Sequence, residues 1–153
     1  MLRWAAPVAT SATLSLAVAG CGGDVAVTAP NPAPPADAQC RTLIGNLPDK
    51  VSGQDTRSVT PSDALAGAWG DPAIVLRCGV VKPAGLQPTS SCAEIDNVGW
   101  FADKRSSDWL FTTIGRSTYV QVSVPNSYQP ASDALVDLAP VIKRFTKLVH
   151  PCR

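Results

Sequence analysis

The clearest hydrophobic pattern in the chain is a strict alternation between residues 73 and 81. Its apolar positions recur at every second residue: Ile74, Leu76, Cys78 and Val80. Successive side chains of a strand point to opposite faces, so this spacing predicts a strand with one buried face. Shorter runs predict four further strands at 92–95, 98–101, 109–114 and 119–124. Because loops too short for a crossover helix join consecutive strands, we expect an antiparallel meander.

Two other segments have the apolar spacing of helices. Within residues 36–47, apolar side chains recur three or four positions apart, and Pro48 ends the segment. The same spacing recurs within 130–149, where aspartates come early and lysine and arginine come late, an order that suits the helix dipole. Pro140 lies inside this second segment and predicts a kink or a break near Ala139.

The segments between these elements give weaker signals. Residues 49–58 are polar and contain glycine, which predicts a loop or a weak edge strand. Thr60, Pro61 and Asp63 have the order of a helix N-terminus and predict a short helix that reaches Gly67. Together the pattern predicts an α+β domain over residues 36–153, in which a small antiparallel β-meander sheet packs against two main helices.

The first twenty residues have the composition of a secretory signal. Arg3 precedes an uncharged run over residues 4–20, which is short and weakly apolar for a membrane span. The run ends in Val18-Ala19-Gly20-Cys21, which resembles the bacterial lipobox. That resemblance implies cleavage before Cys21, a diacylglycerol on its sulfur and a further acyl chain on the new N-terminus. We therefore expect a protein anchored in the membrane on the extracytoplasmic face; the alternative is an ordinary secretory signal followed by a chance cysteine.

Residues 22–35 are rich in proline and predict a tether between the anchor and the domain. Polyproline geometry extends about 3.1 Å per residue, so this segment spans on the order of 40 Å. The simplest interpretation is a flexible spacer with no recognition role.

The cysteine count changes once Cys21 carries lipid. Five cysteines then leave four, namely Cys40, Cys78, Cys92 and Cys152, and an oxidising compartment favours two disulfides. Four cysteines allow three pairings. We prefer Cys78–Cys92, which would join neighbouring sheet segments, and Cys40–Cys152, which would tie the first helix to the C-terminus.

Charge and ligand spacing exclude several classes of partner. The chain has 13 basic and 12 acidic residues, so it has no basic surplus for nucleic acid and its membrane attachment would be covalent. No two cysteines form a C-x₂-C pair, and His150 is the only histidine. We therefore expect no metal and no cofactor.

Two sets of residues are candidate catalytic groups. His150 is the only imidazole base, but the sequence has no Gly-x-Ser-x-Gly elbow for a serine nucleophile. Two carboxylate pairs, Glu94 with Asp96 and Asp133 with Asp137, have the spacing of one strand face and one helix face. The favoured interpretation places all five side chains at the surface or near helix ends, so no catalytic residue is predicted.

The aromatic residues are the best indication of a binding surface. Trp69, Trp100, Trp109 and Tyr128 lie around the predicted strands, as does Tyr119. Flat rings beside polar groups stack on sugars and peptides, which makes these residues candidate ligand contacts. The favoured alternative is that they pack in the core, because aromatic side chains bury large areas in small domains.

Five segments in this order carry a family resemblance: WGDPAIVLRCG at 69–79, Cys92 followed by Gly-Trp at 99–100, FTTIGR at 111–116, YVQVSVP at 119–125 and DALVDLAP at 133–140. They resemble an uncharacterised family of actinobacterial envelope proteins known as domain of unknown function 3515. The resemblance covers most of residues 36–153. It implies an envelope lipoprotein and assigns no binding or catalytic residue.

Two functional hypotheses of different classes follow. The first is a non-catalytic module that binds a wall component or a membrane-protein partner, or assembles with it. The second is a small cell-wall hydrolase or transferase that uses paired carboxylates. A cleft that holds two carboxylates would favour the enzyme, whereas a patch without them would favour binding. A purely structural element without a ligand is a third interpretation.

Overall fold

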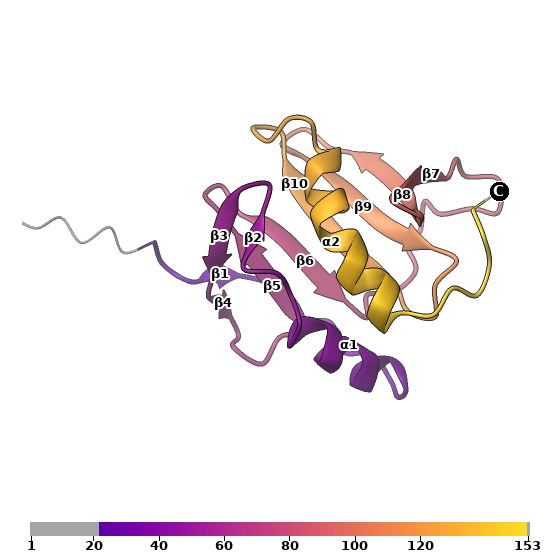
Figure 1. The fold of residues 1–153 in the computed structure, drawn as a ribbon, viewed down its shortest axis with the longest axis horizontal. Coiled ribbons are helices and arrows are strands. Elements are labelled where there is room, and N and C mark those ends of the chain that lie inside the picture. Colours follow the sequence, from indigo (N-terminus) through magenta and orange to yellow (C-terminus); the bar gives the residue numbers. More distant parts are fainter. Residues whose placement is uncertain (1–21, 153) are drawn as a thin grey trace, which may run out of the picture.

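The computed structural model describes residues 22–152, and in it two helices cover one face of an antiparallel sheet (Figure 1). The helices are α1 (Ala36–Ile44) and α2 (Ser132–Phe145). The sheet contains β2 (Lys50–Val51), β3 (Gln54–Arg57), β5 (Ala66–Trp69), β6 (Ile74–Cys78), β7 (Ala93–Ile95), β8 (Val98–Lys104), β9 (Asp108–Ile114) and β10 (Val120–Pro125). The predicted α+β class is confirmed. Within residues 22–152, neither helix is long and apolar enough to cross a bilayer.

The strand order of the eight-stranded sheet is β2-β3-β5-β6-β10-β9-β8-β7. Strands β2, β3, β5 and β6 form one half of the sheet, and β7, β8, β9 and β10 form the other. The two halves meet in the middle of the sheet, where β6 pairs with β10. At this seam Leu76 lies opposite Val122. The first and second halves of the chain therefore share one core, although the loop after β6 leads away to the far edge at β7.

The core lies between the sheet and the helices. Cys40 and Leu43 of α1 are completely buried, as are Leu135, Leu138 and Ile142 of α2. These side chains meet the alternating apolar face of β6 and β10 that the sequence predicted. The helical pattern places its apolar stripe on the sheet in both cases.

Both helices are shorter than predicted. The first ends at Ile44, and its Gly45 amide donates to the Arg41 carbonyl at 3.0 Å. The second continues without interruption past Pro140, so the predicted break does not occur. It ends at Phe145, after which Thr146 is extended and residues 147–152 pass the turn between β9 and β10 and reach Cys92.

The short helix predicted for residues 60–67 is wrong. Residues Val59–Thr60 form strand β4, and the chain turns once before it enters β5. Local N-terminal helix signals were outweighed because β5 pairs with strands on both sides, β3 and β6. The weak edge strand expected within 49–58 is present as the hairpin of β2 and β3.

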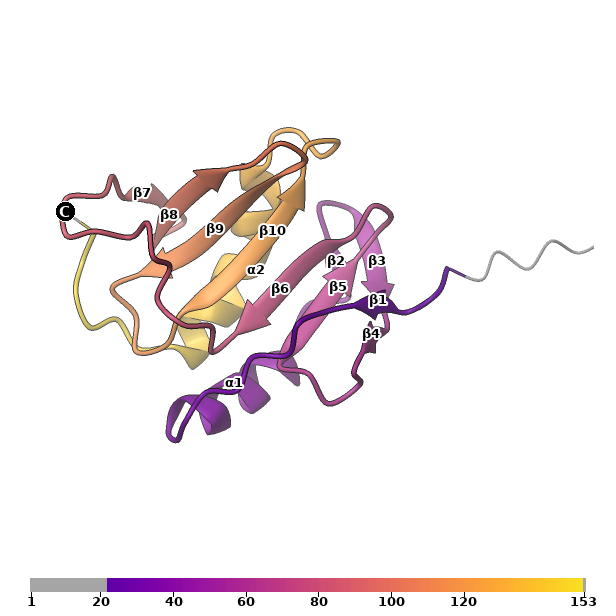
Figure 2. The same cartoon turned by 180° about the vertical axis from the view of Figure 1, so that it is seen from behind.

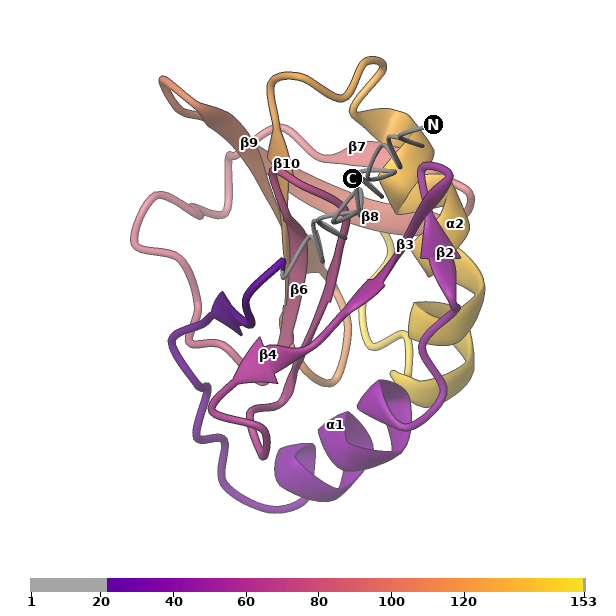
Figure 3. The same ribbon diagram turned by 90° about the vertical axis from the view of Figure 1, so that its left-hand side faces the viewer.

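Residues 22–35 are called the strap here, because they lie across the domain instead of extending away from it. Strand β1 (Val25–Ala26) pairs in parallel with β4, and the Val25 amide donates to the Ser58 carbonyl at 2.8 Å. Arg57 donates to the carbonyl of Gly23. The strap crosses the sheet on the face opposite the helices before it enters α1 (Figures 2 and 3). The flexible spacer predicted for residues 22–35 is thereby corrected, while Cys21 lies outside the described residues.

The two disulfides are Cys40–Cys78 and Cys92–Cys152, with Cα–Cα distances of 5.4 and 5.8 Å. The four cysteines were predicted to pair, but the preferred pairing was wrong. Cys78 ends β6, and β10, β9 and β8 separate that strand from β7, next to Cys92. Cys78 instead points to the helix side of the sheet, where Cys40 of α1 meets it.

Candidate functional site

The sheet face that the helices leave uncovered is called the open face here. A row of side chains crosses it through four neighbouring strands. In this row Arg77 of β6 lies opposite Gln121 of β10, Gln121 opposite Thr112 of β9, and Thr112 opposite Phe101 of β8. These positions alternate with the core positions of the same strands, so their side chains point away from the helices.

A hollow of about 830 Å³ lies over this row and is called the sheet hollow. One wall is the strap at Thr28–Asn31, and another is the loop from Gly79 to Gly85. Its floor and rim are formed by Arg105 of the β8–β9 turn and by five strand residues: Arg77, Phe101, Asp103, Leu110 and Gln121. The volume falls within the range of small-ligand sites, about 300–1,000 Å³.

Hydrogen bonds hold the polar floor of the sheet hollow in place. Gln121 and Thr112 are 7% and 1% exposed, and the Gln121 Nε2 donates to Thr112 Oγ1 at 3.2 Å. That bond directs the Gln121 carbonyl oxygen toward Arg77, whose guanidinium donates to it. A neutral amide therefore orients a cation at the floor of the hollow.

The charges that line the sheet hollow are mostly positive. Three cations, Arg77, Lys82 and Arg105, line it together with one carboxylate, Asp103. Asp103 lies 3.7 Å from Arg105, but both side chains are about half exposed, so water screens the pair. Burial, and then repulsion from Arg105, lower the pKa of Arg77 below its ordinary value. Within residues 22–152, Arg77 forms no salt bridge that would offset these effects.

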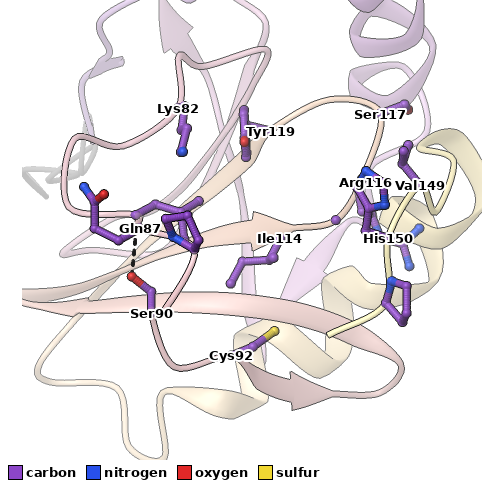
Figure 4. Close-up of a pocket in the computed structure, with 14 residues that line it drawn as sticks. Lys82, Gln87, Ser90, Cys92, Ile114, Arg116, Ser117, Tyr119, Val149 and His150 are labelled. Carbon is purple, nitrogen blue, oxygen red and sulfur yellow. Dashed lines mark hydrogen bonds between the residues drawn. The ribbon is translucent and has the colours of Figure 1, made fainter. Parts of the chain in front are cut away.

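A second hollow of about 560 Å³ adjoins the first and is called the terminal hollow (Figure 4). Lys82 lines both. The terminal hollow lies between the loop at 82–92, the β9–β10 turn at 114–117 and the C-terminal segment at 149–151. The His150 amide donates to the Gly115 carbonyl at 3.0 Å, which fixes the C-terminal segment against the turn.

Arg116 supplies a further cation beside the terminal hollow. Its Nη1 donates to the Thr146 carbonyl at 2.8 Å and its Nη2 to the Asn97 carbonyl at 3.2 Å. Its Nε is buried without a partner in the described residues, and burial lowers the pKa of the guanidinium. Arg116 thus ties Thr146, which follows α2, to the β7–β8 turn, and its role is structural.

The terminal hollow does not join His150 to a serine. Ser117 Oγ donates to Gln39 at 3.2 Å and accepts the Lys147 amide at 3.1 Å. Ser90 accepts the Gln87 amide at 2.9 Å, and Figure 4 shows it across the hollow from His150. Among residues 22–152, the lining of this hollow contains no carboxylate to orient the imidazole.

The aromatic candidates divide by burial. Trp69 and Trp100 are completely buried in the core, so neither ring is available to a ligand. The Trp69 Nε1 donates to the Pro48 carbonyl at 2.9 Å, which explains how its polar atom is satisfied. Trp109 and Tyr128 are partly exposed but lie apart: Trp109 stacks on Phe111, while the Tyr128 hydroxyl donates to the Pro72 carbonyl at 2.8 Å.

One member of each carboxylate pair has a structural partner, and all four side chains lie outside both hollows. Asp96 accepts a hydrogen bond from Lys143 at 2.8 Å, and Asp137 accepts the Ser52 amide at 2.7 Å. Glu94 and Asp133 are exposed. In the part of the chain that the structure describes, no group of three histidine, cysteine or carboxylate side chains is arranged to hold a metal ion.

Sequence reasoning missed Arg77 and Gln121 as site residues. Their positions were visible as the polar phase of two alternating strands, between core residues such as Leu76 and Val122. Alternation shows that both point away from the core. It does not show that β6 and β10 are neighbours, and this pairing is what brings the two side chains together.

Comparison with protein families gives one result. The model of the family described as "Protein of unknown function (DUF3515)" matches residues 5–149, a range that includes most of the predicted signal segment, Cys21 and nearly all of the folded domain. No curated protein and no solved structure matches the chain. Since the match covers almost the full length, the chain belongs to the DUF3515 family.

Proposed function

We propose that this protein is a lipid-anchored cell-envelope protein whose open face binds an envelope component without catalysis. The observation that carries the binding role is the sheet hollow, which is lined by three cations, Arg77, Lys82 and Arg105, and one carboxylate, Asp103, in a chain with a net charge of +1. Because positive and negative residues are nearly equal in number over the whole chain, the net charge does not account for a local cluster of cations. A partner with negative charge would complete it.

The anchor rests on the sequence. A charged start, a short apolar run and Val18-Ala19-Gly20-Cys21 agree with a lipoprotein signal, and they support a location on the extracytoplasmic face of the membrane. Two disulfides within residues 22–152 are consistent with an oxidising compartment.

Binding is favoured over hydrolysis because of the groups that line the hollows. General acid–base hydrolysis of a sugar polymer requires two carboxylates on opposite sides of the scissile bond. Within residues 22–152, Asp103 is the only carboxylate that lines the sheet hollow or the terminal hollow. The cationic side chains suit electrostatic attachment to a partner.

The anchor is tested by mass spectrometry of the protein purified from its own membranes. After reduction and trypsin digestion, the peptide that begins at Cys21 and ends at Arg41 should carry a diacylglyceryl group. The Cys21→Ser variant, which replaces sulfur by oxygen, should lack it. An unmodified peptide at Cys21 in the native protein would overturn the anchor.

The binding surface is tested with two matched valines. Val81 lies on the rim of the sheet hollow and is 86% exposed, whereas Val136 lies on α2 and is 47% exposed. A photoreactive residue at position 81 in intact cells should give a discrete adduct that the same residue at position 136 does not give. Equal patterns at both positions, or no adduct at position 81, would contradict binding through this face.

A further inference from the structure

We propose that the sheet hollow binds a phosphate group, gripped by the guanidinium of Arg77 with Arg105 and Lys82 beside it. This assignment rests on the proposed binding function and names the chemistry of the ligand. It is carried by a partly buried cation without a counter-charge, by its fixed orientation and by the apolar surface next to it.

The first step is the missing counter-charge. Removing a guanidinium from water costs free energy unless an anion or several acceptors replace the water. Among residues 22–152, the hydrogen-bond partner of the Arg77 side chain is the neutral carbonyl of Gln121. Arg105 adds like charge, and the lowered pKa of Arg77 reflects both effects. An anion in the hollow would offset the free-energy cost of removing Arg77 from water, and it would also reduce the repulsion between Arg77 and Arg105.

The second step is orientation. Thr112 fixes Gln121, and Gln121 occupies one Nη of Arg77. A guanidinium has five N–H donors in one plane, so the remaining donors stay available to a ligand in the hollow. Because the floor residues are buried and hydrogen-bonded, the guanidinium is held in place before a ligand arrives, which reduces the entropy lost on binding.

The third step is the class of anion. A planar guanidinium matches two oxygens of a phosphate, and further cations can bind the remaining oxygen. Arg105 and Lys82 line the same hollow and supply those cations. Phe101 and Leu110 add apolar surface that would contact the organic part of a phosphate ester. A phosphate ester therefore fits the hollow better than an isolated inorganic anion.

The test uses full-length protein in neutral detergent at 0.15 M salt, with glycerol 1-phosphate as probe and glycerol as the uncharged control. Thermal unfolding is followed by intrinsic tryptophan fluorescence, because a ligand that binds the folded state stabilises it by RT ln(1 + [L]/Kd) and so raises Tm as its concentration increases. Glycerol 1-phosphate should raise Tm, and glycerol should not. Equal stabilisation by sodium acetate would overturn the assignment to phosphate.

Variants locate the site. Arg77→Gln should lower the affinity for glycerol 1-phosphate at least about tenfold, the loss typical of a charge-assisted hydrogen bond. Arg41→Gln is the matched control, since Arg41 is exposed on α1 and pairs with Asp37 at 2.8 Å. If Arg77→Gln fails to fold, the rim variants Lys82→Gln and Arg105→Gln should each lower the affinity for glycerol 1-phosphate about threefold. Unchanged affinity in all the folded hollow variants would overturn the site.

A second experiment distinguishes two sources of the phosphate, a lipid headgroup and a soluble ester. Micelles doped with phosphatidylglycerol, compared with micelles doped with diacylglycerol, which lacks the phosphate, test a lipid headgroup against the soluble ester. Stabilisation by phosphatidylglycerol that Arg77→Gln abolishes assigns a headgroup, and stabilisation by the soluble ester alone assigns a free or polymeric phosphate. No stabilisation by either overturns the phosphate assignment. A crosslinked adduct at position 81 would still support the binding function in that case. The two experiments therefore test the binding function and the class of ligand independently.

Discussion

Gly99 of β8 lies directly against Cys152: a Cβ atom at position 99 would sit 3.0 Å from the Cys152 sulfur. It would also sit 3.0 Å from the sulfur of Cys92, so the disulfide spans the strand at its one residue without a side chain. Real Cβ contacts are rarely this short. Gly99 thus permits the C-terminus to be fastened onto the open face.

Gly99→Ala should therefore displace the Cys92–Cys152 bridge by a few tenths of an ångström. We expect a loss of about 1–3 kcal/mol in the free energy of unfolding, the usual range for an added methyl group in a tightly packed site. Urea denaturation of the oxidised protein measures it. Gly23→Ala is the control, since a Cβ there meets nothing within 4 Å. Equal stability of the two variants would contradict the close contact.

The two disulfides should differ in their access to a reductant. Cys40 and Cys78 are 0% exposed, whereas Cys92 and Cys152 are partly exposed. Under native conditions, a phosphine reductant followed by alkylation should label Cys92 and Cys152 first, because the buried pair becomes accessible only when the fold opens. Peptide mass spectrometry over time measures the order. Labelling of Cys78 as fast as Cys92 would contradict it.

Arg57 should control whether the strap stays on the sheet. Its guanidinium donates to the carbonyls of Gly23 and Gly70, and so joins the strap to the β5–β6 turn. In Arg57→Ala we expect the Val25 and Val27 amides, which donate to β4 and its flank, to exchange with deuterium about tenfold faster, since a hydrogen bond to a charged group contributes about 1.5–3 kcal/mol. Arg41→Ala is the control. Unchanged exchange at both amides would contradict the clamp.

Periodicity predicted the elements of this fold well where the pattern was strong. The strand around Leu76, the strand around Val122 and the long amphipathic segment around Leu138 are all present. Each presents one apolar face, and burial of that face determines its orientation. The side of the sheet on which each residue lies was therefore available from the sequence.

Contacts between distant segments were not available in the same way. The β6–β10 seam, the docking of the strap on β4 and both disulfides depend on which surfaces meet, and alternation within one strand carries no information on its neighbour. Residues 66–69 show the same effect, because pairing on both sides outweighed the helix signals that precede them. The sheet hollow was missed for this reason, since four strands, a loop and the strap build it together.

The four cysteines of the domain pair in chain order: Cys40, the first, with Cys78, the second, and Cys92, the third, with Cys152, the fourth. The two covalent loops therefore neither overlap nor interlock. A polypeptide that emerges from a translocation channel with its N-terminus first presents these cysteines in the same order. An oxidase that links each newly exposed thiol to the preceding free one would make the native set directly. For a chain exported in this way, the connectivity would allow the disulfides to form in step with export, without reshuffling by an isomerase.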